Sequence, residues 1–412
     1  MSNVTTSPDL SSPAFRADPF PTYAELRREA PILAVDGDSE TPIPWMRGRV
    51  WYTFRYAESV EVLRDTKRFV KDFRNAYTPE EMPEIPQFAM AIADSLIAQD
   101  DPNHVRLRRL VNPAFAVRSV ERRRPQMEEI VHDLLDGVQD QGQMDLIGDF
   151  AFRLPMTVIT SLLGLPPTDG DRLRTLLTNT GTPRTPDEIA ASKERMTEFL
   201  DYLRAAFAER RKAPRDDLMS ELLHAQEEGQ RLNDEEMLNM VALIVGAGFE
   251  TTMGMIGNAT LNLFRHPEAM GRLRAEPGLI DNAFEELQRY EGSVYTATPR
   301  WVGEDLDFHG NKMRHGDRIL PVILSANRDE EQFPDADRLD FDRQANRHIG
   351  FGVGPHFCLG GPLARLETHV ALTALLQRLP NLRLAGEECD VEWLDSDIVH
   401  GPAKMMVAWD PA

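Results

Sequence analysis

A single cysteine, in a glycine-rich loop that leads directly into a helix, constrains this sequence most. The loop reads Phe351-Gly352-Val353-Gly354-Pro355-His356-Phe357-Cys358-Leu359-Gly360-Gly361-Pro362. From Leu363 onward, apolar residues recur at helical spacing, which predicts that a helix begins just after Cys358. Free backbone amides and the positive end of the helix dipole favour a thiolate over a thiol at this position.

The glycines near Cys358 leave the backbone open to a flat partner. Gly352, Gly354, Gly360 and Gly361 lack the Cβ atom that would hold a ligand away or oppose a positive φ. A thiolate held by amide donors, with bare backbone around it, suits a metal in a planar macrocycle. For a lone cysteine, the simpler interpretation is a buried structural side chain in a turn.

Several positions of this loop match one pattern, which resembles the haem-binding loop of the cytochromes P450: Phe351, Gly352, Gly354, His356, Cys358, Leu359 and Gly360. The resemblance extends from about Asp18 to the C-terminus. It implies the cytochrome P450 fold, which is mainly α (α+β) with small sheets and holds haem between a long central helix and the cysteine loop. We therefore expect a flexible arm at residues 1–17 and a single domain at residues 18–412. The implied cofactor is haem b, with Cys358 as the iron ligand and with Phe351, Gly352 and Gly360 against the haem.

Charge and cysteine content exclude several function classes. The net charge of −21 argues against general binding to nucleic acids or anionic membranes. The two cysteines, Cys358 and Cys389, are too few for a disulfide framework and fit a reducing compartment. The N-terminus shows no basic flank followed by an apolar run, and no stretch of roughly 18 residues is uninterruptedly apolar. We expect a soluble cytoplasmic protein.

The rest of the pattern predicts mostly helices. Residues 233–266 are expected to form one long helix, with Asn233 and Glu236 as a cap-like pair and Pro267 at its end. At ~1.5 Å per residue this helix spans roughly 50 Å and must cross the molecule. Further helices are expected at residues 21–30, 57–63, 103–117, 120–139, 146–163, 187–212, 216–228 and 280–291, and strands at 32–35, 50–54, 306–308 and 318–320.

The long central helix contains Val245-Gly246-Ala247-Gly248-Phe249-Glu250-Thr251-Thr252. Two glycines inside a helix cost ~1 kcal/mol each relative to alanine, so packing or function should explain them. The segment resembles the P450 motif on the distal side of the haem. The resemblance implies that Ala247 lies beside the haem, that Thr251 hydrogen-bonds dioxygen and that Glu250 relays protons from water. From the residues alone, tight helix packing with Thr251 bonded back to its own helix is the alternative.

Four basic residues resemble the family's clamp for the two haem propionates: His104, Arg108, Arg300 and His356. His104 and Arg108 are four residues apart and therefore share one helical face. The planar guanidinium of arginine suits carboxylates. Singly, each of these residues could equally be a solvated surface charge.

The run Glu285-Glu286-Leu287-Gln288-Arg289 allows either glutamate to pair with Arg289. The resemblance selects Glu286 and Arg289 and adds Arg338 as the third member of a structural triad behind the haem.

The candidates for substrate contact are mainly apolar: Phe88, Met90, Leu243, Ala247, Val294, Thr296 and Val399. For each of them, a core position is an equally good interpretation. A basic cluster follows the helix of the expected clamp: Arg106, Arg109, Arg118, Arg122, Arg123 and Arg124. We expect this cluster to dock an acidic ferredoxin-type partner, and an ordinary solvated surface is the alternative.

The resemblance implies a haem-thiolate monooxygenase of the soluble bacterial type, which inserts one oxygen atom from dioxygen into a C–H or C=C bond of an apolar small molecule. The sequence contains no strand–GxGxxG–helix unit, so the electrons of NAD(P)H are expected to arrive through a separate ferredoxin and its reductase. Two rival functions remain: a peroxide-dependent peroxygenase or decarboxylase of the same fold, and a non-catalytic haem sensor.

Overall fold

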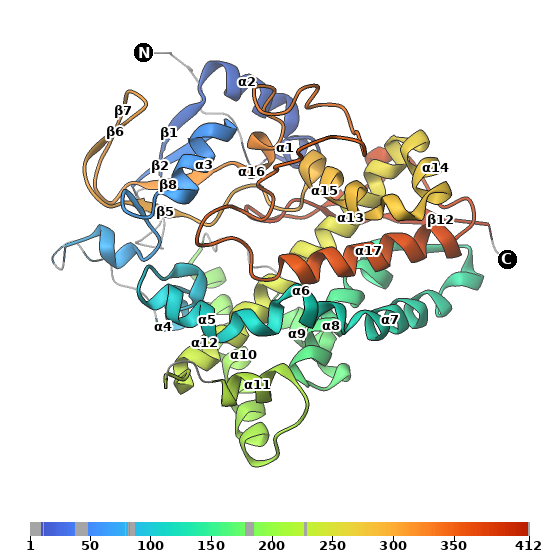
Figure 1. Ribbon diagram of the computed structural model, residues 1–412, viewed down its shortest axis with the longest axis horizontal. Coiled ribbons are helices and arrows are strands. Elements are labelled where there is room, and N and C mark those ends of the chain that lie inside the picture. Colours follow the sequence, from blue (N-terminus) through green and yellow to red (C-terminus); the bar gives the residue numbers. More distant parts are fainter. Residues whose placement is uncertain are drawn as a thin grey trace.

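Helices form most of the structure and surround several small sheets (Figure 1). The computed structural model describes residues 10, 12–37, 48–78, 80, 82, 87–177, 185–225 and 229–410, and it describes their side chains except at 87–89. The helices are α1 Pro13–Ala17, α2 Phe20–Glu29, α3 Tyr56–Arg64, α4 Gln87–Ala93, α5 Asn103–Phe115, α6 Val117–Glu121, α7 Arg124–Asp136, α8 Arg153–Leu163, α9 Gly170–Leu177, α10 Pro186–Lys212, α11 Leu218–His224, α12 Asp234–Gly248, α13 Glu250–Arg265, α14 Pro267–Ala275, α15 Ile280–Glu291, α16 Ile323–Ala326 and α17 Gly361–Arg378.

The largest sheet has the strand order β1 (Ile32–Asp36), β2 (Arg49–Thr53), β8 (Arg318–Pro321), β5 (Arg300–Val302) and β3 (Phe69–Val70). Strands β2 and β8 are parallel, and the other neighbours are antiparallel. The smaller sheets pair β6 (Leu306–Phe308) with β7 (Asn311–Met313), β10 (Glu392–Trp393) with β11 (Pro402–Lys404), and β12 (Met406–Ala408) with both β4 (Gln143–Asp145) and β9 (Arg383–Leu384).

The largest apolar core lies among the helices and brings together α7, α8, α10, α12, α13 and α17. Helix α17, which follows the cysteine loop, packs directly on α13 and α7. Figure 1 shows α17 in orange-red beside the yellow α13, with the five-stranded sheet at the other side of the molecule. The fold expected from the sequence is therefore confirmed: a helix-rich α+β architecture with small sheets.

The long central helix is interrupted, contrary to the expectation of one continuous helix. Helix α12 ends at Gly248 and α13 begins at Glu250, with Phe249 (φ −100°, ψ −48°) between them. The cap-like pair is confirmed, because Asn233 and Glu236 form a reciprocal capping box. At Gly248, a Cβ atom would overlap Cδ1 of Ile159 in α8, so glycine permits this close packing at the interruption.

Two other expected helices are also divided. Residues 120–139 fall into α6 and α7, because Pro125 lies in the first turn of α7 and lacks the N–H that a continuous helix would need there. Residues 146–163 begin with one π-helical segment, Leu146–Ala151, before α8 starts.

The expectation of a flexible arm up to residue 17 is wrong for residues 12–17. Ser12 Oγ accepts a hydrogen bond from the Phe15 N–H and caps α1. The Phe15 ring is buried, with its centroid 5.5 Å from that of Tyr23 and 6.1 Å from that of Tyr295. This apolar anchor orders the segment. Residues 1–9 and 11 lie outside the described residues, and one domain over residues 18–412 stays a prediction.

Two helical stretches, Leu146–Leu163 and Asp234–Arg265, are long and apolar enough to cross a membrane. Within the most apolar 18 residues of each stretch, 72% and 61% of the residues are buried inside the protein, as in the core helices of a soluble fold. They are weak evidence for a membrane span.

Candidate functional site

The cysteine loop is held by its own backbone. Cys358 N–H donates to the carbonyl of Phe351 (2.8 Å), and Gly352 N–H donates to Ile349 (2.8 Å). Gly352 and Gly354 have φ values of +71° and +83°, which residues with a Cβ atom rarely adopt. A Cβ atom on Gly354 would also lie 2.9 Å from the Leu63 carbonyl oxygen. The loop therefore presents Cys358 just before α17, as the sequence predicts.

The Cys358 side chain is exposed. Desolvation by the surrounding protein raises the pKa of the thiol, and the backbone N–H groups of Gly360 and Gly361 together with Arg108 and Arg365 partly offset that rise. The amide effect expected from the sequence is thus present, but desolvation outweighs it. A metal ion bonded to the sulfur would supply the missing stabilisation of the thiolate.

A partly buried ion pair supports the loop from behind. Glu285 accepts hydrogen bonds from Arg365 Nε (2.5 Å) and from His348 Nε2 (2.7 Å). Burial opposes ionisation of Glu285, but these two partners lower its pKa to about 2. The Arg365 guanidinium lies 4.4 Å from the centre of the Phe351 ring and so fixes both the start of α17 and the start of the loop.

The four residues expected to form the propionate clamp converge. The His104 and His356 rings are 4.1 Å apart. Burial lowers the pKa of His356 to about 2, and the nearby charges of Lys71, His104, Arg300 and Arg108 lower it further. Burial likewise lowers the pKa of Arg300 to about 10.

Lys71 is a further member of this cluster that the sequence analysis missed. It is 3% exposed, and its Nζ donates to Thr298 Oγ1 (2.7 Å) and to the Pro299 carbonyl (2.8 Å). Burial and the charge of Arg300 lower its pKa well below the usual range. A single lysine in an irregular stretch carries no sequence signal, and only the pairing of β3 with β5 brings it here.

The clamp cluster (Lys71, His104, Arg108, Arg300 and His356) fits a ligand with two carboxylates. His104 is 2% exposed; its Nε2 has no hydrogen-bond partner among the described residues, and its Nδ1 has only a long contact of 3.5 Å with Asp101 Oδ1. The carboxylate of Asp100 is occupied by the N–H groups of Lys71 (2.9 Å) and Asp72 (3.0 Å). Buried donors require partners, and the two propionates of haem would provide them.

On the distal side, Gly246 and Ala247 are exposed although the α12 residues before them are largely buried. Thr251 Oγ1 donates to the Ala247 carbonyl at 2.9 Å, so the hydroxyl bonds back to its own helix. Its oxygen can still accept a hydrogen bond. The next residue, Glu250, is partly buried at the first position of α13.

A second acid, Glu367 of α17, lies beside Thr252 and was not identified from the sequence. It is 1% exposed, and burial raises its pKa to about 8, a rise that the Thr252 hydroxyl partly offsets. The sequence did contain a signal for this residue: Glu367 is an acid on the apolar face of the helix, four residues after Leu363 and three before Val370.

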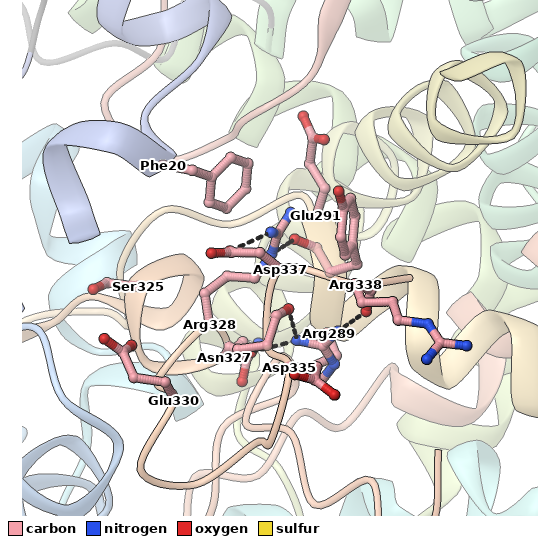
Figure 2. Close-up of polar contacts among 12 residues, drawn as sticks. Phe20, Arg289, Glu291, Ser325, Asn327, Arg328, Glu330, Asp335, Asp337 and Arg338 are labelled. Carbon is pink, nitrogen blue, oxygen red and sulfur yellow. Dashed lines mark hydrogen bonds and ion pairs between the residues drawn. The ribbon is translucent and has the colours of Figure 1, made fainter. Parts of the chain in front are cut away.

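The structural triad differs from the expected one. Glu286 pairs with Arg289 through two contacts of 2.8 Å, as expected. The third member is Arg343, whose Nε lies 3.0 and 3.1 Å from the two Glu286 oxygens. The Arg338 side chain is exposed and points away from the cluster, and only its carbonyl accepts from Arg289 NH2 (Figure 2). The expectation for Arg338 is wrong because the turn after Ala336 directs its side chain outward.

Arg328 forms a second buried contact beside the triad (Figure 2). Its guanidinium lies between the rings of Phe20 (4.2 Å) and Tyr290 (3.5 Å) and donates to Asp337 at 2.8 Å. Together with Arg289, it ties the loop that leads towards Cys358 to α15 and α2.

The substrate candidates occupy several elements. Val294 bridges Val399, and Thr296 bridges Val322. Met90 lies in α4, and α4 packs against α12, which carries Leu243 and Ala247. The Phe88 side chain lies outside the described residues. Two surface grooves, one between α9 and α10 and one beside α11, include none of these candidates.

The expected docking patch is smaller than the sequence suggested. Arg106 is committed to an ion pair with Glu236 of α12 and to Asn103. Arg124 pairs with Glu121 at 2.9 Å. The arginines of this cluster that the structure leaves exposed are Arg109, Arg118 and Arg122.

Comparisons with known proteins agree with this geometry. The family model described as "Cytochrome P450" matches residues 183–383. The chain is 35% identical over 396 residues to the polyketide biosynthesis cytochrome P450 PksS of Bacillus subtilis, covering 96% of each chain. It is 38% identical over 391 residues to the mycinamicin IV hydroxylase/epoxidase of Micromonospora griseorubida, covering 94% of each. The solved structure of Bacillus subtilis PksS superimposes with a TM-score of 0.89 over 98% of this chain and 100% of that one, at 34% identity.

Proposed function

The chain belongs to the cytochrome P450 family of monooxygenases, and on this premise we propose that it inserts one oxygen atom from dioxygen into an apolar small molecule by hydroxylation or epoxidation. The observation that carries the proposal is the joint arrangement of the Cys358 loop and the clamp cluster. A lone thiol could be structural, and a lone group of basic residues could bind any anion. Together they match the ligand atom and the propionates of one cofactor.

In this proposal Cys358 binds the haem iron, and Lys71, His104, Arg108, Arg300 and His356 hold the propionates. The bound haem supplies the activation of dioxygen, and the thiolate ligand promotes O–O cleavage. Thr251 offers a hydroxyl on the distal side, and Glu250 beside it can exchange protons with water. The opening at Gly246 and Ala247 leaves room for a flat group beside α12.

Turnover by the holoprotein with a ferredoxin, its reductase and NAD(P)H tests this proposal. A compound library is first screened for haem spin-state shifts, and each binding compound is then assayed for an oxygenated product. Product formation only with added hydrogen peroxide would favour a peroxygenase or decarboxylase. Ligand binding without turnover under either condition would favour a sensor.

We propose an apolar, medium-sized substrate. The supporting residues are Met90, Leu243, Val294 and Val399, which are apolar and lie on the elements around the distal side. Two relatives bear names that refer to polyketide biosynthesis and to mycinamicin IV, which is consistent with such a substrate. The acidic chain with both cysteines free fits the proposed cytoplasmic location.

The proposed redox partner is an acidic ferredoxin that docks on the cysteine-loop side. Arg109, Arg118 and Arg122 are exposed there, and Val117 (65% exposed) and Phe357 (39%) supply an apolar centre. The His104–His356 contact brings α5, which carries Arg109, next to the cysteine loop.

Charge reversal tests this docking surface. Arg122→Glu should slow the first electron transfer from ferredoxin several-fold at low salt, and the difference from wild type should shrink as salt rises. The matched control is Arg204→Glu, an exposed arginine on α10 outside this surface. Equal rates for both variants, or rates indifferent to ionic strength, would remove the surface from the proposal.

A further inference from the structure

A buried hydrogen-bonded chain joins Glu291, His400 and Tyr295. His400 Nε2 lies 2.9 Å from Glu291 Oε1, and His400 Nδ1 lies 3.1 Å from the Tyr295 hydroxyl. The three residues are 2%, 0% and 5% exposed. Nothing in the oxygenation chemistry uses these groups, so a different role has to account for the cost of burying them.

The ionisation states of Glu291 and Tyr295 favour one direction for the hydrogen bonds. Burial opposes ionisation of Glu291, but His400, Arg265 and Asn262 lower its pKa to about 2. Burial raises the pKa of Tyr295 above its ordinary value, so its hydroxyl keeps its proton. The arrangement that satisfies every group has Tyr295 O–H donating to Nδ1 and His400 Nε2–H donating to the Glu291 carboxylate.

Neighbouring residues hold this chain rigidly. The Trp393 ring stacks on the His400 ring, with centroids 4.9 Å apart and planes 10° apart. Asn262 Nδ2 and Arg265 NH1, both on α13, lie 2.9 and 3.1 Å from Glu291 Oε2. The chain is therefore fixed from α13, from α15 and from the C-terminal strands.

Tyr295 and His400 of the hydrogen-bonded chain belong to the backbone segments that carry substrate candidates. Tyr295 N–H donates to the Ile398 carbonyl (3.0 Å), and His400 N–H donates to the Ser293 carbonyl (2.9 Å), around the Val294–Val399 bridge. Successive side chains of extended segments point to opposite faces. Tyr295 is buried while Val294 and Thr296 on either side of it are partly exposed, as this alternation requires.

The bridge also touches α13 close to Thr251. A Cβ atom on Gly254 would lie 3.4 Å from Val399 Cγ1 and 3.1 Å from the His400 carbonyl oxygen. Gly254 lies three residues, ~4.5 Å along the helix axis, beyond Thr251. At its other end, the segment that begins at Val294 reaches Arg300 of the clamp cluster. It thus runs from the distal helix to the propionate site.

We propose that the Glu291–His400–Tyr295 chain is a positioning element that fixes the Val294–Val399 bridge against α13 and so determines which part of a substrate is presented to the oxidant. This inference rests on the proposed function, because it takes the haem to lie between α13 and the clamp cluster. The three residues act through the bridge and touch no substrate themselves.

The test compares ferric holoproteins of wild type, Tyr295→Phe and His400→Gln. Tyr23→Phe is the matched control, since Tyr23 is a buried tyrosine of the same aromatic cluster outside the hydrogen-bonded chain. The probes are two ligands of haem iron: imidazole, and 4-phenylimidazole, which adds a phenyl ring and so would reach further from the iron. Haem content and thermal midpoint are recorded for every variant.

We expect Tyr295→Phe and His400→Gln to change the ratio of the two dissociation constants about fivefold, the effect of losing one typical hydrogen bond. Hydrogen exchange of the Tyr295 and His400 amides should accelerate in the same variants, and the control should show neither effect. A lower thermal midpoint with an unchanged ratio and unchanged exchange would overturn the proposal, because that outcome indicates a merely structural role. If the wild-type protein shows no ferredoxin-driven turnover, but the variants still change the ratio of the two dissociation constants, the proposed function is refuted and the positioning element stands.

Discussion

Replacing Glu286 should destabilise the protein far more than replacing its neighbour Glu285. Glu286 is 1% exposed, and its carboxylate accepts from Arg289 at 2.8 Å and from Arg343 at 3.0 Å. It also accepts from the Asp340 N–H at 2.9 Å. In Glu286→Gln the two guanidinium groups lose their anionic partner inside the protein.

The size of this effect follows from burial. Removing one partner of a buried pair typically costs about 3 to 5 kcal/mol, because the remaining charge is left uncompensated. Unfolding entropy of about 2.1 cal/mol/K per residue gives about 0.9 kcal/mol/K for 412 residues, so the thermal midpoint should fall by about 3 to 6 °C. Glu285 and its partner Arg365 are 31% and 29% exposed. Solvent screens this pair in part, so its loss should cost less than the loss of the Glu286 pair and should lower the thermal midpoint by less.

Differential scanning calorimetry of holoproteins with equal haem content, at one pH and one scan rate, measures both variants. Equal haem content is required because a bound ligand raises the midpoint by itself. A fall in Glu286→Gln that is no larger than the fall in Glu285→Gln would refute the reasoning, since burial would then not decide the strength of these pairs.

Two further predictions concern Thr251 of α13 and Glu367 of α17. Thr251→Ala should raise hydrogen peroxide release per NAD(P)H consumed while haem content stays unchanged. The control Thr260→Ala loses a similar bond to its own helix (2.8 Å) and should release no more peroxide than wild type. Peroxide release at the wild-type level in Thr251→Ala would remove this hydroxyl from the mechanism. Because burial raises the pKa of Glu367 to about 8, above about 4.3 in the unfolded chain, the folded state holds an extra proton between these values and loses stability as pH rises through them. The urea midpoint of Glu367→Gln relative to wild type should therefore increase from pH 5 to pH 8, and a difference independent of pH would contradict the assigned protonation.

Local chemistry was readable from the sequence by itself. The loop glycines, the helix after Cys358 and the capping box at Asn233 are specified by residues adjacent in the chain, whose steric and hydrogen-bonding demands do not depend on distant partners. The spacing of His104 and Arg108 is of the same kind, since one helical turn sets it.

Contacts between distant segments were decided only by the tertiary structure. Arg343 replaces Arg338 beside Glu286 because the turn after Ala336 sets side-chain directions, and turn geometry is weakly encoded. Lys71 joins the clamp cluster through the pairing of β3 with β5. His400 reaches Glu291 only after the C-terminal strands fold back on α13. The energy of such contacts depends on burial, and burial is a property of the whole fold rather than of any short segment.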